Sequence, residues 1–131
     1  MTRQLQDLAK RAAARFGIPS AWSVLEGNWP VLDAAGNPAL DITAVVVTPA
    51  GDDDANDGLL AFLVIEVESL FRIDGVTLRL TDEGRLALSF PSRTSRRGTK
   101  HSLVRPRDQA ARTAIERAIF AALGIREEAQ R

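Results

Sequence analysis

The 131-residue chain contains no cysteine, and this absence removes several classes of protein at once. Without thiols there is no disulfide framework, no thiolate zinc site and no cysteine nucleophile. Long hydrophobic runs are also missing, since no segment approaches the 18 or so apolar residues of a membrane-spanning helix. The polar start of the chain is unlike the hydrophobic region of a secretory signal. We therefore expect a cytoplasmic protein with no membrane partner.

Aromatic side chains are scarce at 5%, and net charge is absent because 17 basic residues cancel 17 acidic ones. A neutral chain has no overall field that would attract a polyanion such as nucleic acid. Apolar residues nevertheless make up 45% of the chain, which is ordinary for a globular protein. A chain of this length buries roughly two-thirds of its unfolded surface. A single domain can therefore fold here without a metal or a disulfide.

Two segments have the apolar spacing of amphipathic helices, one near each end of the chain. Residues 2–16 place their apolar side chains on one face and are followed by Gly17, a helix stop. Residues 108–123 show the same spacing, with Asp108 as the predicted cap and Gly124 as the stop.

The middle of the chain has the β-branched and alternating patterns of strands. The predicted strands are residues 40–48, 59–67, 71–80 and 85–90, with a brief extended piece at 102–104. Residues 18–39 contain three prolines and no periodicity, which predicts irregular chain with one short extended piece near residues 29–32.

These elements predict an α+β fold: an antiparallel sheet of four to five strands with a C-terminal helix and an extra N-terminal helix. The predicted organisation is an N-terminal helix and irregular extension at 1–39, an α+β domain at 40–124, and a short tail at 125–131.

The zero net charge conceals two opposite blocks, to which residues 1–25 add plus three and the residues after 112 add nothing. Residues 26–83 contain twelve acids against Arg72 and Arg79, a balance of minus ten. Residues 85–112 contain eight basic residues against Asp108 alone, a balance of plus seven. Seven of those eight are arginine, and guanidinium suits phosphate oxygens and the guanine edge better than ammonium does. The basic block therefore favours a nucleic-acid partner.

Residues 91–100 contain no large apolar side chain, so we expect a loop that lies over the surface. Its cations are the candidate contacts to the phosphate backbone of nucleic acid. The candidate nucleic-acid-binding residues are Arg93, Arg96, Arg97, Lys100 and Arg105. The alternative that involves no nucleic acid is a solvated loop whose charges pair with the acidic half of the chain or with a partner subunit.

Several residues in this part of the chain also carry a family resemblance. Residues 71–80, a short turn and residues 84–93 give a strand, a glycine-led return strand and a Pro-Ser-Arg loop. Then come a glycine, an X-Pro step, an acid and an arginine, which here are Gly98, Arg105-Pro106, Asp108 and Arg112. In this order and spacing, the segment from about residue 41 to 123 resembles the SpoVG family (stage V sporulation protein G, the septation regulators).

The resemblance implies a four- or five-stranded antiparallel sheet with a C-terminal helix, assembled as a homodimer. It also implies DNA binding, with RNA binding as a second possibility, and a regulatory rather than catalytic role without a cofactor. The chain departs from the family pattern at four positions. Arg93 replaces the loop lysine, and Lys100 replaces the hydrophobic residue usual two places after the loop glycine. Arg105 replaces the histidine of the His-Pro step, and Arg107 replaces the apolar residue after it. The first forty residues have no counterpart in the family.

Other readings of single motifs are weaker. Asp52, Asp54 and Asn56 alternate as in a calcium loop, but the glycine is one place late and Leu63 takes the position of the bidentate glutamate, so a solvated turn is favoured. Glu66 and Glu68 are expected on the solvent side of one strand rather than as a catalytic pair.

The single histidine, His101, cannot make a usual zinc site alone and is expected on the flank of the basic loop. Trp22 and Trp29 are expected to pin their segment to the core. We expect no catalysis and no metal. The alternative function is a non-catalytic protein-interaction or assembly module that uses the same sheet and basic loop.

Overall fold

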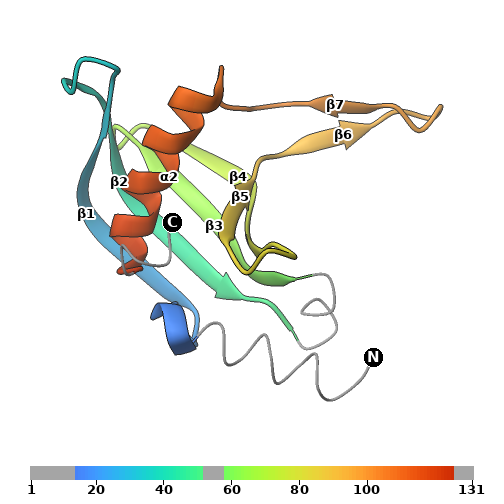
Figure 1. The fold of residues 1–131 in the computed structure, drawn as a ribbon, viewed down its shortest axis with the longest axis horizontal. Helices are drawn as coiled ribbons and strands as arrows, with labels where there is room; N and C mark the ends of the chain where they lie inside the picture. Colours follow the sequence, from blue (N-terminus) through green and yellow to red (C-terminus); the bar gives the residue numbers. More distant parts are fainter. Residues whose placement is uncertain (1–13, 52–57, 126–131) are drawn as a thin grey trace.

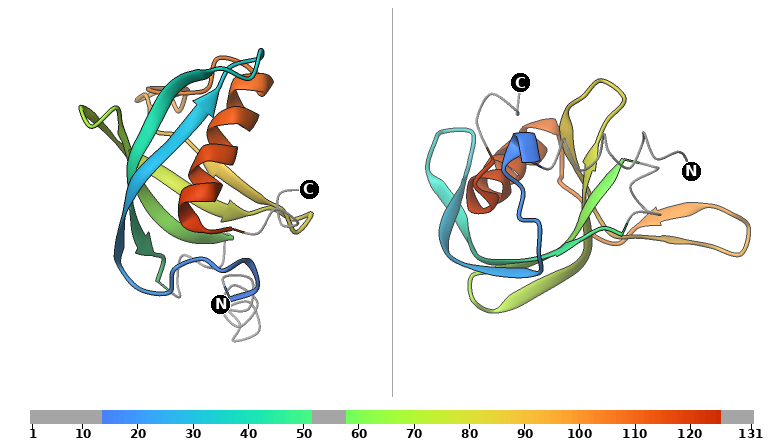
Figure 2. Two further views of the ribbon diagram at one scale, coloured as in Figure 1. Left: turned by 90° about the vertical axis from the view of Figure 1, so that its left-hand side faces the viewer. Right: turned by 90° about the horizontal axis from the view of Figure 1, so that it is seen from below.

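The computed structural model of the chain describes residues 14–51 and 58–125, which form a curled five-stranded antiparallel sheet with one long helix in its concave side (Figures 1 and 2). The strands lie side by side in chain order. They are β1 (Ser23–Leu32), β2 (Pro38–Pro49), β3 (Leu59–Val67), β4 (Phe71–Leu80) and β5 (Leu86–Ser89). A separate ribbon pairs β6 (Ser92–Thr94) with β7 (Lys100–Ser102), and the helix is α2 (Gln109–Leu123).

The predicted α+β fold is confirmed, with five strands in the main sheet. The N-terminal helix is also present: residues 14–16 are helical, and Gly17 ends the helix with a φ of +79°. The rest of that predicted helix lies outside the described residues.

The core forms where inward side chains of the sheet meet one face of α2. Val47 of β2, Leu63 of β3 and Val76 of β4 are direct cross-strand neighbours, and none is more than 1% exposed. Ile119 and Leu123 close the core from the helix. Burial of these aliphatic side chains is the main force that holds helix and sheet together.

The outer edge of the short strand β5 is closed by two side chains of α2. The carboxylate of Glu116 accepts a hydrogen bond from the backbone N–H of Leu88 at 3.0 Å. Arg112 donates to the carbonyl of the same residue at 2.9 Å and lies 3.6 Å from Glu116. The helix thus satisfies both polar groups that a further strand would have paired.

Three hairpins of the chain share one turn geometry. In each turn of five residues, the backbone N–H of the first residue donates to the carbonyl of the fifth. The N–H of the glycine in fourth position donates to the carbonyl of the first residue at 2.9–3.0 Å. The glycines have φ between +81° and +85°, which is the geometry of a three-residue loop with a glycine bulge. These turns are residues 33–37, 81–85 and 95–99, and their two tip residues are Ala34-Ala35, Asp82-Glu83 and Arg96-Arg97.

The prediction of irregular chain over residues 18–39 is wrong for residues 23–28, and the extended piece expected near residues 29–32 is the end of a longer strand. Residues 23–32 form β1, which pairs with β2 despite Pro30 and a register shift between Glu26 and Trp29. A strand at the edge of a sheet tolerates both features, because its outer N–H groups need no partner. The predicted boundary between residues 39 and 40 therefore falls within one hairpin of one sheet.

Both ends of α2 agree with the sequence. Asp108 caps the helix by accepting from the backbone N–H of Ala111 at 2.9 Å, and Gly124 ends it with a φ of +74°. The predicted tail begins one residue too early, because Ile125 donates its N–H to the carbonyl of Phe120 and is only 6% exposed. Residues 126–131 lie outside the described part of the chain.

We expect Glu116→Ala to lower the free energy of unfolding by about 1–3 kcal/mol, because the N–H of Leu88 then loses its acceptor in a half-buried site. Glu116→Gln keeps an acceptor and should lose less. Urea denaturation measures both, with the exposed neighbour Arg117→Ala as the control. Equal losses in all three variants would contradict the role of the carboxylate.

Asp108 makes helix stability depend on pH. The hydrogen bond from Ala111, followed by the contact with Arg107, holds the pKa of this carboxyl below its usual value of 3.8. A lowered pKa stabilises the fold above pH 3.8, and this contribution is lost as the pH falls through the lowered value. We expect Asp108→Ala to reduce Tm more at pH 7 than in acid below the lowered pKa, where the wild type has itself lost the charge, as measured by thermal denaturation. Asp108→Asn keeps a neutral capping oxygen, so its effect should vary less with pH than that of the wild-type carboxylate.

Candidate nucleic-acid interface

The basic segment does not lie over the surface as expected but forms a two-stranded arm, residues 92–102. Ser92 pairs with Ser102, Arg93 with His101 and Thr94 with Lys100. The arm projects away from the sheet and α2 in Figure 1 and in the right view of Figure 2. Its residues have no large apolar side chain to bury, so they satisfy their backbone groups by pairing with each other and leave both faces in solvent. The extended piece predicted at 102–104 lies instead at 100–102.

The tip of the arm presents two adjacent arginines. Ser95 N–H donates to the Thr99 carbonyl at 2.8 Å, and the Ser95 hydroxyl oxygen accepts from Thr99 N–H at 3.2 Å. Gly98 takes a φ of +81° and so completes the turn. Arg96 and Arg97 occupy the two tip positions, and both are exposed. The turn is held by Ser95, Gly98 and Thr99, so the two arginines are free to point at a ligand.

The base of the arm is fixed to the sheet at Pro91. Its carbonyl accepts from Leu103 N–H at 3.0 Å, which brings the two ends of the arm together. Pro91 also packs against Gly75 of β4, so closely that a Cβ on Gly75 would lie 3.1 Å from the Pro91 Cβ. The direction in which the arm leaves the body is thus set by a contact with β4.

The arm concentrates positive charge without acids. Residues 92–102 contain four cations and no acidic residue. All four cations are exposed, and no described residue makes an ion pair or a side-chain hydrogen bond with any of them. By contrast, Arg72 and Arg112 on the body are both paired with glutamates. The cations of the arm are therefore available to an external anion.

The structure brings together four of the five predicted binding residues. Arg93 and Lys100 lie on the stem of the arm, and Arg96 and Arg97 lie at its tip. Arg105 is exposed but lies beyond the arm, in the segment that leads to α2. His101 faces Arg93 across the ribbon, as expected for a residue beside the basic loop. The local pattern that indicates a hairpin in this segment is the Ser-x-x-Gly turn at residues 95–98, which matches the Thr-x-x-Gly turn at residues 81–84.

The dimensions of the arm suit a nucleic-acid groove. The three residues of β6 span roughly 10 Å, and the turn at residues 95–99 extends beyond them. The major groove of DNA is about 12 Å wide and 8.5 Å deep and admits a two-stranded ribbon. The arm is therefore long enough for its tip to reach the floor of the groove while its stem stays level with the phosphates.

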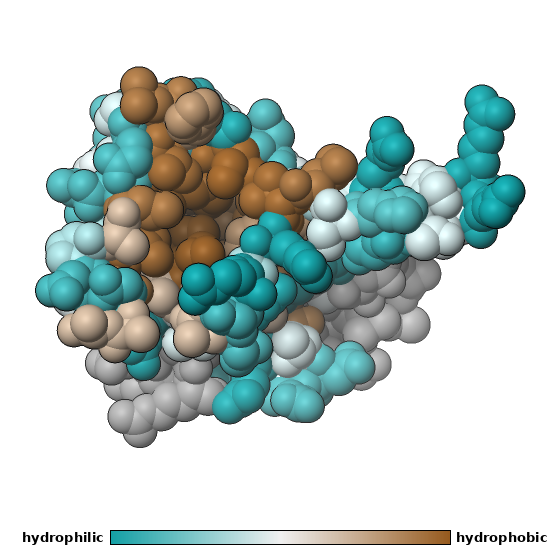
Figure 3. Space-filling view, turned by 90° about the horizontal axis from the view of Figure 1, so that it is seen from above, coloured by the Kyte–Doolittle hydropathy of each residue, from teal (hydrophilic) through white to brown (hydrophobic). Residues whose placement is uncertain are grey.

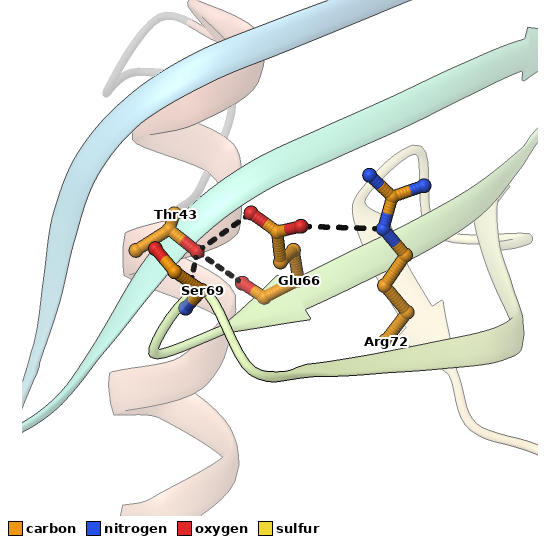
Figure 4. Close-up of polar contacts among 4 residues, drawn as sticks. All are labelled: Thr43, Glu66, Ser69 and Arg72. Atoms are coloured by element: carbon orange, nitrogen blue, oxygen red, sulfur yellow. Dashed lines mark hydrogen bonds and ion pairs between the residues drawn. The ribbon is translucent and has the colours of Figure 1, made fainter.

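Glu66 and Glu68 have structural partners and do not share a strand face. The Glu66 carboxylate accepts from the Thr43 hydroxyl at 3.0 Å and from Arg72 Nε at 3.2 Å, and Ser69 N–H donates to the same hydroxyl (Figure 4). Glu68 lies beyond β3 in a tight turn and accepts from the backbone N–H of Asp41. The expectation of one shared face is wrong, because the chain turns at Glu68.

The two tryptophans behave differently. Trp29 packs against the core, and its ring covers Gly27, where a Cβ would lie 2.8 Å from the indole. Trp22 is 66% exposed, so the expectation that both pin the segment is wrong for this residue. The acidic positions of the suggested calcium loop, 52–57, lie outside the described residues. Within residues 14–51 and 58–125 there is no group of three His, Asp or Glu side chains that could hold a metal.

A groove of about 750 Å³ lies between α2 and the β1–β2 hairpin. Its lining comes from residues 29–34 and 39–40 and from the helix face that carries Ala110, Ala114 and Ala118. Figure 3 views the molecule from above, where apolar side chains surround a hollow on the body and the polar arm projects to one side. The groove is mainly apolar, and the cations of the arm are not part of it.

Because the tip positions of this turn carry Ala-Ala, Asp-Glu or Arg-Arg in the same protein, the fold does not depend on their identity. We expect the double substitution Arg96→Asp and Arg97→Glu, which copies the tip at 82–83, to change the free energy of unfolding by less than about 0.5 kcal/mol. Urea denaturation measures this. A larger loss would mean that the arginines stabilise the body of the protein.

No helix of the described chain is long and apolar enough to cross a membrane. In comparisons with known proteins, no family model, no curated protein and no solved structure matches this chain. The similarity to the SpoVG family therefore stays a prediction, and the geometry of the arm carries the functional argument.

Proposed function

We propose that this protein is a non-catalytic regulator that binds DNA or RNA through the arm. The observation that supports the proposal most is the pair of arginines at the tip. A tip whose two side chains are exposed and bond to no described residue, yet suit phosphate and guanine, is best explained by a ligand.

The four cations of the arm have distinct places in this proposal. Arg93 and Lys100 lie on the stem, where phosphates on either side of a groove are within reach of long side chains. Arg96 and Arg97 enter furthest, and there a guanidinium can bind a phosphate or donate two hydrogen bonds to a guanine. Arg105, outside the arm, would add a contact to the flanking backbone.

The neutral net charge is compatible with this function. Screening in physiological salt limits the reach of a charge to about 8 Å, so an arm that projects into solvent presents its own charge rather than that of the whole chain. Acidic residues such as Glu66 and Glu68 are occupied within the body. Release of counterions from the nucleic acid would then provide much of the binding free energy.

The double substitution Arg96→Ala and Arg97→Ala removes two phosphate contacts, and each contact contributes roughly 0.9 to the slope of log K against log salt. We therefore expect binding to a random 20-base-pair DNA duplex to weaken about 60-fold at 0.1 M salt. The slope itself should fall by about two. Fluorescence anisotropy over 50–300 mM salt measures both, and a single-stranded RNA of equal length shows which nucleic acid is preferred.

The chain offers a matched control at the other charged tip. The substitution of Asp82 and Glu83 by alanine alters the same two turn positions and should leave the salt slope unchanged. If the arginine variant binds both nucleic acids with an unaltered slope, the arm is not the binding site. If the wild type binds neither the DNA duplex nor the RNA at 50 mM salt, the proposal fails. The alternative function, contact of the basic arm with an acidic protein surface, is then favoured.

A further inference from the structure

One side of α2 does not fill the space between the helix and the sheet. The face of the helix that is turned to the core carries Ile119 and Leu123, which pack against the strands. The face beside the β1–β2 hairpin carries small side chains instead, among them Ala110, Ala114 and Ala121. A single methyl group is too short to reach the hairpin opposite, so a groove of about 750 Å³ stays open. This volume is within the range of small-molecule sites, roughly 300–1,000 Å³.

The hairpin wall of the groove is apolar and partly open to solvent. Trp29 and Leu40 line it and are half-buried, Val31 is buried, and Leu32 is 45% exposed. Figure 3 shows the apolar hollow facing the viewer. Apolar surface left in contact with water is unfavourable, and a concave apolar surface with few polar groups is the usual form of a ligand site. An occupant of this groove therefore has an apolar body.

Three of the four charged residues that line the groove are engaged within the fold. The carboxylate of Asp33 accepts from the backbone N–H groups of Ala35 and Asn37, both at 2.9 Å. Asp108 caps α2 and also accepts from Arg107 Nε at 3.1 Å. The turn that carries Asp33 lies at the same end of the molecule as the start of α2 (Figures 1 and 2). Both acids of the groove are thus at this end.

The fourth charged residue, Arg117, is uncommitted. It is exposed, and no residue of 14–51 or 58–125 makes an ion pair or a side-chain hydrogen bond with it. Nine residues of α2 separate it from Asp108, which is roughly 14 Å along the helix axis. The groove thus has its acids at one end and an available cation toward the other. This asymmetry favours an occupant whose apolar body ends in an anionic group beside Arg117.

We propose that the groove binds a free amphipathic carboxylate, an alkyl chain with one anionic end. The chain lies between α2 and β1, against Trp29 and Ala114, and the carboxylate binds the guanidinium of Arg117, whose fork can donate two parallel hydrogen bonds. The helix from Ala110 to Ala121 is roughly 16 Å long, which suits an extended chain better than a compact ring. The inference does not rest on nucleic-acid binding, because the cations of the arm do not line the groove.

Trp29 allows a direct test because it lines the groove. In the full chain with Trp22→Phe, Trp29 is the only tryptophan left. Titration with dodecanoate, below the concentration at which it forms micelles, should change the Trp29 fluorescence and reach saturation. Decanoate should bind about 15-fold more weakly, because it buries two CH₂ groups fewer. Calorimetry of the wild type should give one dodecanoate per chain.

The apolar part of the site can be tested by filling it. Ala114→Leu places a larger side chain in the groove, and Ala110→Leu does the same from an exposed position that does not put the fold at risk. We expect each to weaken dodecanoate binding by about tenfold or more, since a well-filled site does not accept further methylene groups. Ala21→Leu adds the same side chain at an exposed position outside the groove and should bind as the parent does.

The anionic end of the ligand is tested by reversing the charge. Arg117→Glu should weaken dodecanoate binding about fivefold and should instead favour dodecyltrimethylammonium, which has the same chain with a cationic end. Arg85→Glu, a reversal at an exposed position outside the groove, is the matched control and should keep the preference for dodecanoate. Circular dichroism shows that each variant is folded before its binding is compared.

Three results would overturn the proposal: a Trp29 signal that does not change with dodecanoate, binding that neither leucine variant in the groove weakens, or a wild type that binds both dodecyl compounds equally. The double variant Arg96→Ala and Arg97→Ala keeps every residue of the groove and should bind dodecanoate as the wild type does. Loss of binding there would assign the carboxylate to the arm and contradict the proposal. No nucleic acid is present in these experiments, so their failure is distinct from failure of the function proposed for the arm.

Discussion

The contact of Arg112 and Glu116 with Leu88 is the polar link between the helix and the last strand of the sheet. Two side chains of α2 satisfy the N–H and the carbonyl of one residue in the last strand of the sheet, and they do so in a half-buried place where unpaired polar groups are costly. The same arginine lies over the ring of Phe90, 5.5 Å from its centre, just before the chain reaches Pro91 and the arm. One pair of charged residues thereby closes the outer edge of β5 and ties the helix to the strand from which the arm departs.

The early end of β5 has two consequences for function. Because the chain leaves the sheet after Ser89, residues 92–102 can pair only with each other, and they become a ribbon in solvent with all of its cations exposed. For the same reason the first half of β4 keeps an open edge. The candidate nucleic-acid interface and the open edge of β4 are thus both results of one short strand, and Gly75, which packs against Pro91, lies between them.

Much of the fold could be predicted from local patterns. The bounds of β3 and β4, the cap at Asp108 and the stop at Gly124 agree with the structure because they depend on residues close in the chain. Strand β1 could not be predicted, since Pro30 and the bulge are tolerated only at a sheet edge, and edge position is not a local property. The arm was predicted as a loop because its pairing depends on a turn signature rather than on apolar alternation.

The sequence by itself determined the charge blocks, the three glycine turns and the absence of thiols, since each is a property of residue identity at neighbouring positions. Which cations are free for a ligand was decided by tertiary structure: Arg72 and Arg112 acquire glutamate partners only because sheet and helix bring them together. Arg96 and Arg97 keep none in the described chain because they sit at the end of a projecting ribbon. Distance from the folded body, which no local pattern encodes, separates the structural arginines from those available to bind.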